Sequence, residues 1–204
     1  MSKGRFIVFE GIDGCGKTTQ FMKFINYLYN KDKHNHILMT REPWKERKIR
    51  EILREDDDAF SQAEKLANMF VKDRREHVSK LIIPNLNTGI NVISDRYLFS
   101  TICYQTAQGL SMQRLIEMHR GLIVPDLIFI LDLSLKEAGK RMKKEIRNEQ
   151  KFEKNKEFLE KVRKNYLKMP EVFKKHNNIE IINSNQTIRK VHDDVVSAFE
   201  SRIK

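Results

Sequence analysis

The segment from residue 6 to residue 19, FIVFEGIDGCGKTT, constrains the fold of this chain more than any other stretch. Its apolar first half has the composition of a buried strand, and its second half has the pattern Gly-x-x-x-x-Gly-Lys-Thr. Apolar residues follow at helical spacing, at Phe21, Phe24 and Leu28. The segment therefore predicts a strand, a tight loop and a helix in direct succession, a context that a chance glycine-rich turn would lack.

The residues of this loop suit the binding of phosphate groups. Gly11, Gly14 and Gly16 allow the backbone to bend tightly and to aim its N–H groups inward. The helix that follows adds partial positive charge at its N-terminus. Lys17 supplies a full positive charge for β- and γ-phosphates, and the Thr18 hydroxyl is a ligand for Mg²⁺. We therefore predict a nucleotide phosphate-binding loop.

Five short apolar runs alternate with stretches of helical periodicity along the chain. We expect strands at 5–9, 36–40, 90–95, 127–133 and 179–183, and helices at 18–30, 61–82, 111–120, 135–149, 155–173 and 188–203. This alternation indicates an α/β fold, in which ligands gather at the carboxyl ends of the strands. We predict a single domain over residues 1–204, a three-layer α/β/α arrangement of the P-loop NTPase class with a five-stranded parallel sheet.

Length and composition support one domain in the cytoplasm. The chain has 204 residues, of which 40% are hydrophobic, which suits one sizeable core. No apolar stretch approaches the roughly 20 residues that span a bilayer, so we expect no membrane association. The chain starts without the apolar region of a signal peptide, and its two cysteines are too few for a disulfide framework. A cytoplasmic location is the simplest expectation.

The formal net charge of +11 is concentrated in one segment. Residues 140–175 carry 14 Lys or Arg and 6 Glu, a local charge of +8. One interpretation is a small basic lid, inserted at about 140–155, that places cations on a transferring phosphoryl group. The other is a solvated charged helix stabilised by pairs such as Glu157 and Lys161. Both interpretations are compatible, because the lid can precede the solvated helix.

Two of the expected strands end in charged residues. Asp95 and Arg96 end the third strand, where the Asp can position Mg²⁺ through water and the Arg can clamp phosphate oxygens. A strand-ending ion pair is the alternative, which the neighbouring phosphate loop makes less attractive. Arg41 and Pro43 follow the second strand, but this stretch also fits a solvated turn.

Phe70 and Arg74 lie four residues apart on an expected helix and so project from the same face. The ring can stack on a base, and the guanidinium can donate to a base oxygen. The spacing by itself favours a core phenylalanine beside an arginine that reaches the solvent.

The order of these motifs resembles the thymidylate (dTMP) kinase family over essentially the whole chain. The resemblance rests on FEGIDGCGKTT at 9–19, TREP at 40–43, DRY at 95–97 followed by STICYQ at 100–105, PDL at 125–127, KFE at 151–153 and NSNQTI at 183–188. It implies ATP-dependent phosphorylation of dTMP to dTDP with Mg²⁺, and a homodimer. We expect no nucleic-acid partner, because the excess charge is confined to the expected lid.

The resemblance also implies site residues. For catalysis it implies Lys17, Asp13, Arg96 and Arg141, and for the metal Thr18 and Asp95. For ATP it implies Gly11, Ile12, Asp13, Gly14, Cys15, Gly16, Lys17, Thr18, Thr19, Arg141 and Asn185. For dTMP it implies Asp13, Arg41, Pro43, Phe70, Arg74, Asp95, Arg96, Thr101, Tyr104 and Gln105; we add Lys45, a cation for the acceptor phosphate at a position where this chain departs from the family pattern.

The chain departs from the family pattern at several positions. Trp44-Lys45-Glu46 replaces the usual Gly-Gly-Thr near the acceptor phosphate, which leaves open another acceptor such as dUMP, dGMP or a deoxynucleoside. Gly14 stands where some members have a catalytic Arg, so the lid would supply that charge. Its candidate cations are Lys143, Lys144 and Arg147. A nucleic-acid-binding P-loop protein is the remaining alternative, against which stands the absence of a recognisable binding motif.

Overall fold

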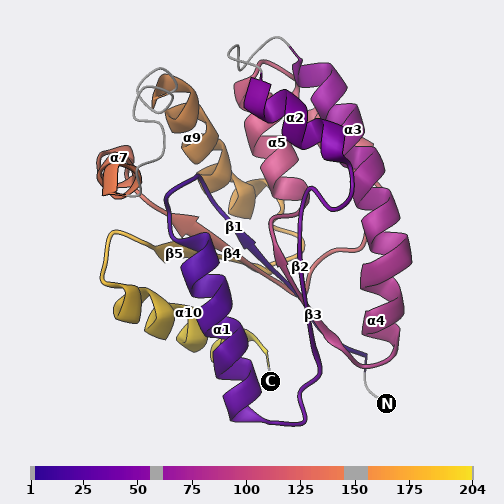
Figure 1. Cartoon of the computed structure of the whole chain (residues 1–204), viewed down its shortest axis with the longest axis vertical. Helices are drawn as coiled ribbons and strands as arrows, with labels where there is room; N and C mark the ends of the chain where they lie inside the picture. Colours follow the sequence, from indigo (N-terminus) through magenta and orange to yellow (C-terminus); the bar gives the residue numbers. More distant parts are fainter. Residues whose placement is uncertain (1–2, 56–61, 145–155, 204) are drawn as a thin grey trace.

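The computed structural model of the protein describes residues 3–55, 62–144 and 156–203. Its centre is a sheet of five parallel strands in the order β2-β3-β1-β4-β5 (Figure 1). The strands are β1 (Phe6–Glu10), β2 (Ile37–Arg41), β3 (Asn91–Asp95), β4 (Leu127–Asp132) and β5 (Ile179–Asn183). Each begins and ends within one residue of its expected bounds.

Strand β1 is fully buried because it lies in the middle of the sheet and both faces are covered. It pairs with β3 and β4, and its Phe9 lies beside Asp95 of β3. On the outer side of β3, Arg41 of β2 also lies beside Asp95. Because these strands are parallel and in register, their carboxyl ends meet at one edge of the sheet. The phosphate loop and both charged strand ends therefore share that edge.

Helices cover both faces, as expected for three layers (Figure 1). Helices α1 and α10 pack together on one face, and α5 and α9 pack together on the other, with α3 against α5. The helices described are α1 (Lys17–Lys31), α2 (Arg47–Glu55), α3 (Ala63–His77), α4 (Ile83–Asn87), α5 (Leu98–Ala107), α6 (Met112–Met118), α7 (Leu135–Lys144), α9 (Lys156–Val172) and α10 (Ile188–Arg202), with a π-helical turn η1 (Val78–Ile82) joining α3 to α4. The predicted α/β class and parallel sheet are confirmed.

Helices α2, α4 and α5 were not among the expected elements. Helix α5 is buried on nearly every side, so its sequence LFSTICYQTA lacks the one-sided apolar stripe of a surface helix. Helix α2, RKIREILRE, is highly charged and buries Ile49. The expected helix at 135–149 is seen as α7, and its remainder lies outside the described residues together with most of the expected lid. Among the described helices, none is long and apolar enough to cross a membrane.

Candidate active site

The phosphate loop joins β1 to α1 and takes its shape from glycines. Gly11, Gly14 and Gly16 all have positive φ angles, of 138°, 78° and 92°. A Cβ atom at Gly11 would lie 2.6 Å from the Leu131 carbonyl oxygen and 2.8 Å from Cys15 Sγ, so only glycine fits there. Gly16 is the left-handed residue directly before α1. The loop therefore turns sharply into a helix N-terminus, as phosphate binding requires.

Lys17 lies inside this loop. Its Nζ donates hydrogen bonds to the carbonyl oxygens of Gly11, at 3.0 Å, and of Ile12, at 2.8 Å. Asp13 Oδ1 is 3.9 Å away. The side chain is buried although it is charged, so its ammonium group is held against the loop backbone. The arrangement places a positive charge where the loop surrounds a phosphate.

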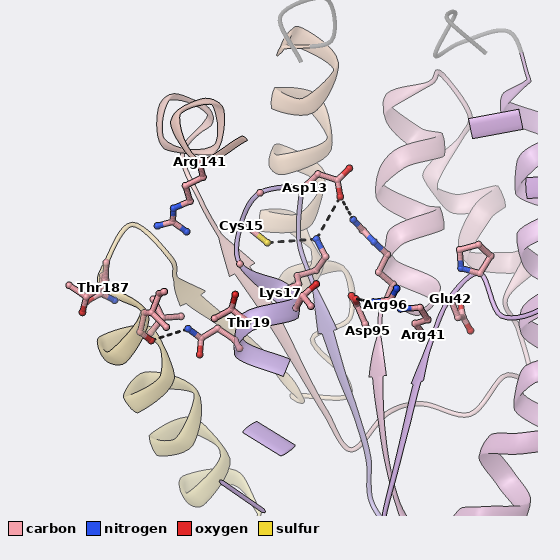
Figure 2. Close-up of a pocket in the computed structure, with 18 of the residues that line it drawn as sticks. Asp13, Cys15, Lys17, Thr19, Arg41, Glu42, Asp95, Arg96, Arg141 and Thr187 are labelled. Carbon is pink, nitrogen blue, oxygen red and sulfur yellow. Dashed lines mark hydrogen bonds and ion pairs between the residues drawn. The ribbon is translucent and has the colours of Figure 1, made fainter. Parts of the chain in front are cut away.

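A cleft of about 920 Å³ opens at the carboxyl edge of the sheet (Figure 2). It combines the phosphate loop, the ends of β2 and β3, and the loop before α10. Its lining residues are Asp13, Gly14, Cys15, Gly16, Lys17, Thr18, Thr19, Gln20, Arg41, Glu42, Pro43, Arg50, Asp95, Arg96, Arg141, Gln186, Thr187, Ile188 and Val191. This volume suits small-molecule ligands, and the many cations favour anionic ones.

Arginines approach the phosphate loop from opposite sides (Figure 2). Arg96, directly after β3, donates from NH2 to Asp13 Oδ1 at 2.6 Å and from NH1 to the Gly11 carbonyl at 3.2 Å. Arg141 of α7 donates to the Ser184 carbonyl at 2.8 Å and lines the cleft beyond the loop. Two guanidinium groups thus flank the loop, where phosphate oxygens would need them.

Asp95 is the acidic residue of the cleft floor that suits a metal. Its Oδ2 is 3.4 Å from an Arg41 nitrogen, and its buried Oδ1 has no hydrogen-bond partner among the described residues. Thr18 lines the same cleft. The described residues contain no group of three or more His, Cys, Asp or Glu side chains placed to hold a metal. This donor set fits Mg²⁺, which takes oxygen ligands and binds through phosphates and water rather than in a protein cage.

The residues expected at the base are not among those that line this cleft. Arg74 of α3 is 1% exposed, and its NH2 donates to the Tyr97 carbonyl and to Thr101 Oγ1, both at 3.1 Å. The hydroxyl of Tyr104 and Oε1 of Gln105 are buried and lack hydrogen-bond partners among the described residues. Phe70 is partly buried. The fold thus brings Arg74 and Thr101 into contact on α3 and α5, and leaves these polar groups of Tyr104 and Gln105 on α5 unpaired within the described residues.

Arg74 is held by further residues that the sequence did not single out. Its Nε donates to Glu42 Oε2 at 2.6 Å, and its NH1 is 2.6 Å from Nε2 of His119. Glu42 Oε1 is also 3.1 Å from His77 Nδ1. Burial, with a contribution from Arg74, lowers the pKa of His119 to about 3. His119 is therefore neutral and accepts from the guanidinium.

The unusual Trp44-Lys45-Glu46 stretch is fixed by Asp73, the neighbour of Arg74 on α3. Its carboxylate accepts the backbone N–H groups of all three residues, at 2.5, 2.9 and 3.0 Å. The Trp44 ring stacks on the His77 ring, and Lys45 Nζ lies 3.9 Å from the centre of the Trp44 ring. Lys45 does not line the cleft, whereas Arg50 of the following helix does. Asp73 lies 18 or more residues after α2 in the chain, so no local sequence pattern indicates that its carboxylate binds the backbone in front of that helix.

On the donor side, the structure places the expected Asn185 away from the cleft lining. Its Oδ1 accepts from the N–H and the hydroxyl of Ser134, so it ties the loop before α10 to the end of β4. The next residues, Gln186 to Ile188, line the cleft instead, and Gln20 donates to the Ile188 carbonyl at 3.0 Å. The side chains of Lys143, Lys144 and Arg147 lie outside the described part of the chain.

Comparison with known proteins agrees with these motifs. The chain matches the family described as Thymidylate kinase over residues 9–195. It is 40% identical over 210 residues to a probable thymidylate kinase of Thermococcus gammatolerans, covering 98% of both chains. It is 36% identical to a thymidylate kinase of Caldicellulosiruptor saccharolyticus, covering 95% of this chain and 98% of that one. The crystal structure of thymidylate kinase from Ehrlichia chaffeensis matches with a TM-score of 0.74 and 28% identity, over 97% and 99% of the two chains. The resemblance is confirmed, and the chain belongs to the thymidylate kinase family.

Proposed function

We propose that this protein transfers the γ-phosphoryl group of ATP to dTMP and so produces dTDP. One observation carries the proposal: in a chain of this family, the phosphate loop with Lys17 shares one cleft with Arg41, Asp95 and Arg96. Phosphoryl transfer needs little covalent chemistry from the protein, and depends on positioning and charge stabilisation. A cleft with this set of cations and a buried carboxylate supports that chemistry.

Each charged group has a distinct task in this proposal. The loop amides and Lys17 hold the β- and γ-phosphates of ATP, and Arg141 approaches them from α7. Arg96 and Arg41 hold the acceptor phosphate, with Asp13 keeping Arg96 at the loop. Thr18 and Asp95 would hold Mg²⁺, which supplies charge neutralisation on the phosphates when bound. The acceptor phosphate is already anionic, so no strong general base is required.

On the acceptor side, we assign Phe70 to stacking on the thymine and Arg74 to its oxygen. The family motif carries this assignment, and the contact with Thr101 holds the Arg74 guanidinium toward α5. The unpaired groups of Tyr104 and Gln105 support placing the nucleoside beside the same helix. Pro43 remains a proposed acceptor residue on the basis of the family motif, and Lys45 on the basis of its charge next to that motif.

Further parts of the proposal concern organisation and location. We propose one domain over residues 1–204 with a basic lid at about 140–155, which the charge of that segment supports. We propose a homodimer through α3 and α6, as the family resemblance implies. We also propose a cytoplasmic location, where thiols stay reduced, since Cys15 and Cys103 are both unpaired.

A coupled assay of ADP release tests the function. The enzyme is given ATP, Mg²⁺ and, in separate reactions, dTMP, dUMP, dGMP, dCMP, AMP or thymidine. We expect a clear preference for dTMP. Turnover with another acceptor instead would support the phosphoryl-transfer mechanism, and would indicate that Trp44-Lys45-Glu46 changes the acceptor specificity. Absence of turnover with all six, together with salt-dependent binding to DNA, would contradict the proposal.

The base-site assignment is tested separately by Arg74→Ala. We expect the KM for dTMP to rise about tenfold or more, because a charged hydrogen bond to the base is lost, while the KM for ATP changes little. Far-UV circular dichroism checks that the variant is folded. Equal effects on both substrates would argue against a base-reading role.

A further inference from the structure

Glu10 is a fully buried carboxylate that the proposed chemistry does not use. It is the last residue of β1 and directly precedes the phosphate loop. Its Oε1 accepts the backbone N–H groups of Tyr97, at 2.8 Å, and Ser100, at 3.1 Å. Its Oε2 accepts from the Ser100 hydroxyl at 2.6 Å and from the Tyr166 hydroxyl at 2.9 Å. Four donors from α5, α9 and the turn before α5 therefore converge on one acid.

Both hydroxyls also contact Arg96. Its NH1 lies 2.9 Å from Ser100 Oγ and 3.5 Å from the Tyr166 oxygen. A guanidinium can only donate, so each hydroxyl accepts from Arg96 and has its own hydrogen left to donate, either to Glu10 Oε2 or to the other hydroxyl, whose oxygen is 3.0 Å away. Glu10 thus faces four donors, an environment that suits an ionised carboxylate: burial raises the pKa of its carboxyl, and Arg96 and these hydrogen bonds act against that rise. Its negative charge faces the positive charge of Arg96 through two hydroxyl groups, and such a network strengthens each of its bonds.

The backbone of Arg96 needs this support. Its φ angle of 75° is unusual for a residue with a side chain, and conformations of this kind persist where surrounding contacts hold them. Its N–H donates to the Phe9 carbonyl at 2.9 Å, and its carbonyl accepts from Ser94 Oγ at 2.7 Å. These contacts fix the backbone, whereas Ser100 bonds NH1 of the guanidinium and Asp13 bonds NH2. Figure 2 shows the contact with Asp13.

Glu10 also replaces a missing helix cap. Tyr97 precedes α5 and offers no side-chain hydrogen bond to the first turn. The carboxylate of Glu10 bonds the N–H groups of Tyr97 and Ser100 instead, and a negative charge at that place favours the helix dipole. One buried acid therefore connects the strand of the phosphate loop to both the first turn of α5 and the guanidinium of Arg96.

We propose that Glu10, acting mainly through Ser100 and secondarily through Tyr166, is a positioning residue that orients Arg96 toward the acceptor phosphate. The inference rests on the proposed function, because it takes Arg96 as a phosphate-binding group. It assigns a task to an acid that touches neither substrate. The distances rank the two bridges, since the Arg96 contact with Ser100 is 0.6 Å shorter than that with Tyr166.

Substitution of the bridges tests the proposal without removing the buried acid. For Ser100→Ala we expect the KM for dTMP to rise about tenfold, with the KM for ATP changed less than about twofold. Tyr166→Phe should have a smaller effect of the same kind, and Ser100→Thr should stay close to wild type. Tyr97→Phe is the matched control, because its buried hydroxyl donates to the Ile123 carbonyl at 3.1 Å and does not contact Arg96.

A double-mutant cycle separates positioning from stability. In an Arg96→Ala background, we expect Ser100→Ala to raise the KM for dTMP no further, because there is no guanidinium left to orient. An equal factor in both backgrounds would overturn the proposal, as would a wild-type KM in Ser100→Ala. If that variant does not fold, Tyr166→Phe replaces it in the same cycle. If Arg96→Ala itself leaves the KM for dTMP unchanged, the proposal also fails, whereas the acceptor panel decides independently whether the proposed function stands.

Discussion

The buried His119 makes the stability of this protein depend on pH in a way that can be calculated. Its Nδ1 is 2.6 Å from the Leu115 carbonyl, which can only accept, and its Nε2 is 2.6 Å from Arg74, which can only donate. The ring is therefore neutral, with its hydrogen on Nδ1. A second proton would have to lie between the imidazole and a guanidinium in a buried site. Burial and Arg74 lower the pKa of His119 from 6.5 to about 3 for this reason.

The sign and size of the effect follow from proton linkage. In the unfolded chain, His119 has its ordinary pKa and gains a proton as the pH falls below 6.5, while the folded protein stays neutral there. The unfolded state then binds more protons, so the free energy of unfolding decreases with falling pH. The loss is about 1.4 kcal/mol per pH unit once the unfolded histidine is protonated. Between pH 8 and pH 5 it amounts to about 2 kcal/mol.

Urea unfolding of wild type and His119→Gln across this pH range measures the effect. A glutamine oxygen can accept from Arg74 in place of Nε2 but does not titrate. We therefore expect the wild type to lose about 2 kcal/mol more than the variant, since all other groups titrate in both proteins. The exposed His34 gives the control His34→Gln, which should track wild type. A difference between wild type and His119→Gln that is constant from pH 8 to pH 5 would refute the reasoning.

Two further predictions concern the phosphate loop. Gly11→Ala should lower the free energy of unfolding by about 3 kcal/mol, because its Cβ would lie 2.6 Å from the Leu131 carbonyl oxygen at a positive φ. Gly109→Ala, with a φ of 101° and open space around the new Cβ, should cost only about 1 kcal/mol in the same urea experiment; equal losses would contradict the steric argument. Lys17→Ala should lower kcat about 10³-fold or more while far-UV circular dichroism stays unchanged, and wild-type turnover would sink the phosphate-loop assignment.

Most of the cleft could be predicted from the sequence because it consists of strand ends. Arg41 and Asp95 are the last residues of β2 and β3, and the phosphate loop follows β1. Local composition identifies all three strands, and their parallel pairing in register brings these groups to one edge of the sheet. The predicted strand bounds were therefore sufficient to predict that these side chains lie close together. The residues that we propose for the base were harder to identify, because the spacing of Phe70 and Arg74 also fits an ordinary helix surface.

The partners of the buried charges could not be predicted in this way. Arg74 is bound by Glu42 and His119, which lie 32 and 45 residues away in the chain. These contacts depend on how α3, α6 and the end of β2 pack, and no local pattern signals it. Helix α5 was missed for a related reason: burial on nearly every side removes the periodicity by which a helix is recognised.

The sequence by itself determined the phosphate loop, the five strands with their order along the chain, and the family. Those features depend on short-range chemistry: glycines that adopt positive φ, a lysine at a helix N-terminus, and apolar runs of strand length. Only the tertiary structure decided which acid is paired with which arginine. Glu10 is linked to Arg96 through the Ser100 hydroxyl, and Glu42 binds Arg74 directly. A buried charge requires partners on several elements at once, and those elements meet only when the sheet and its helices have packed.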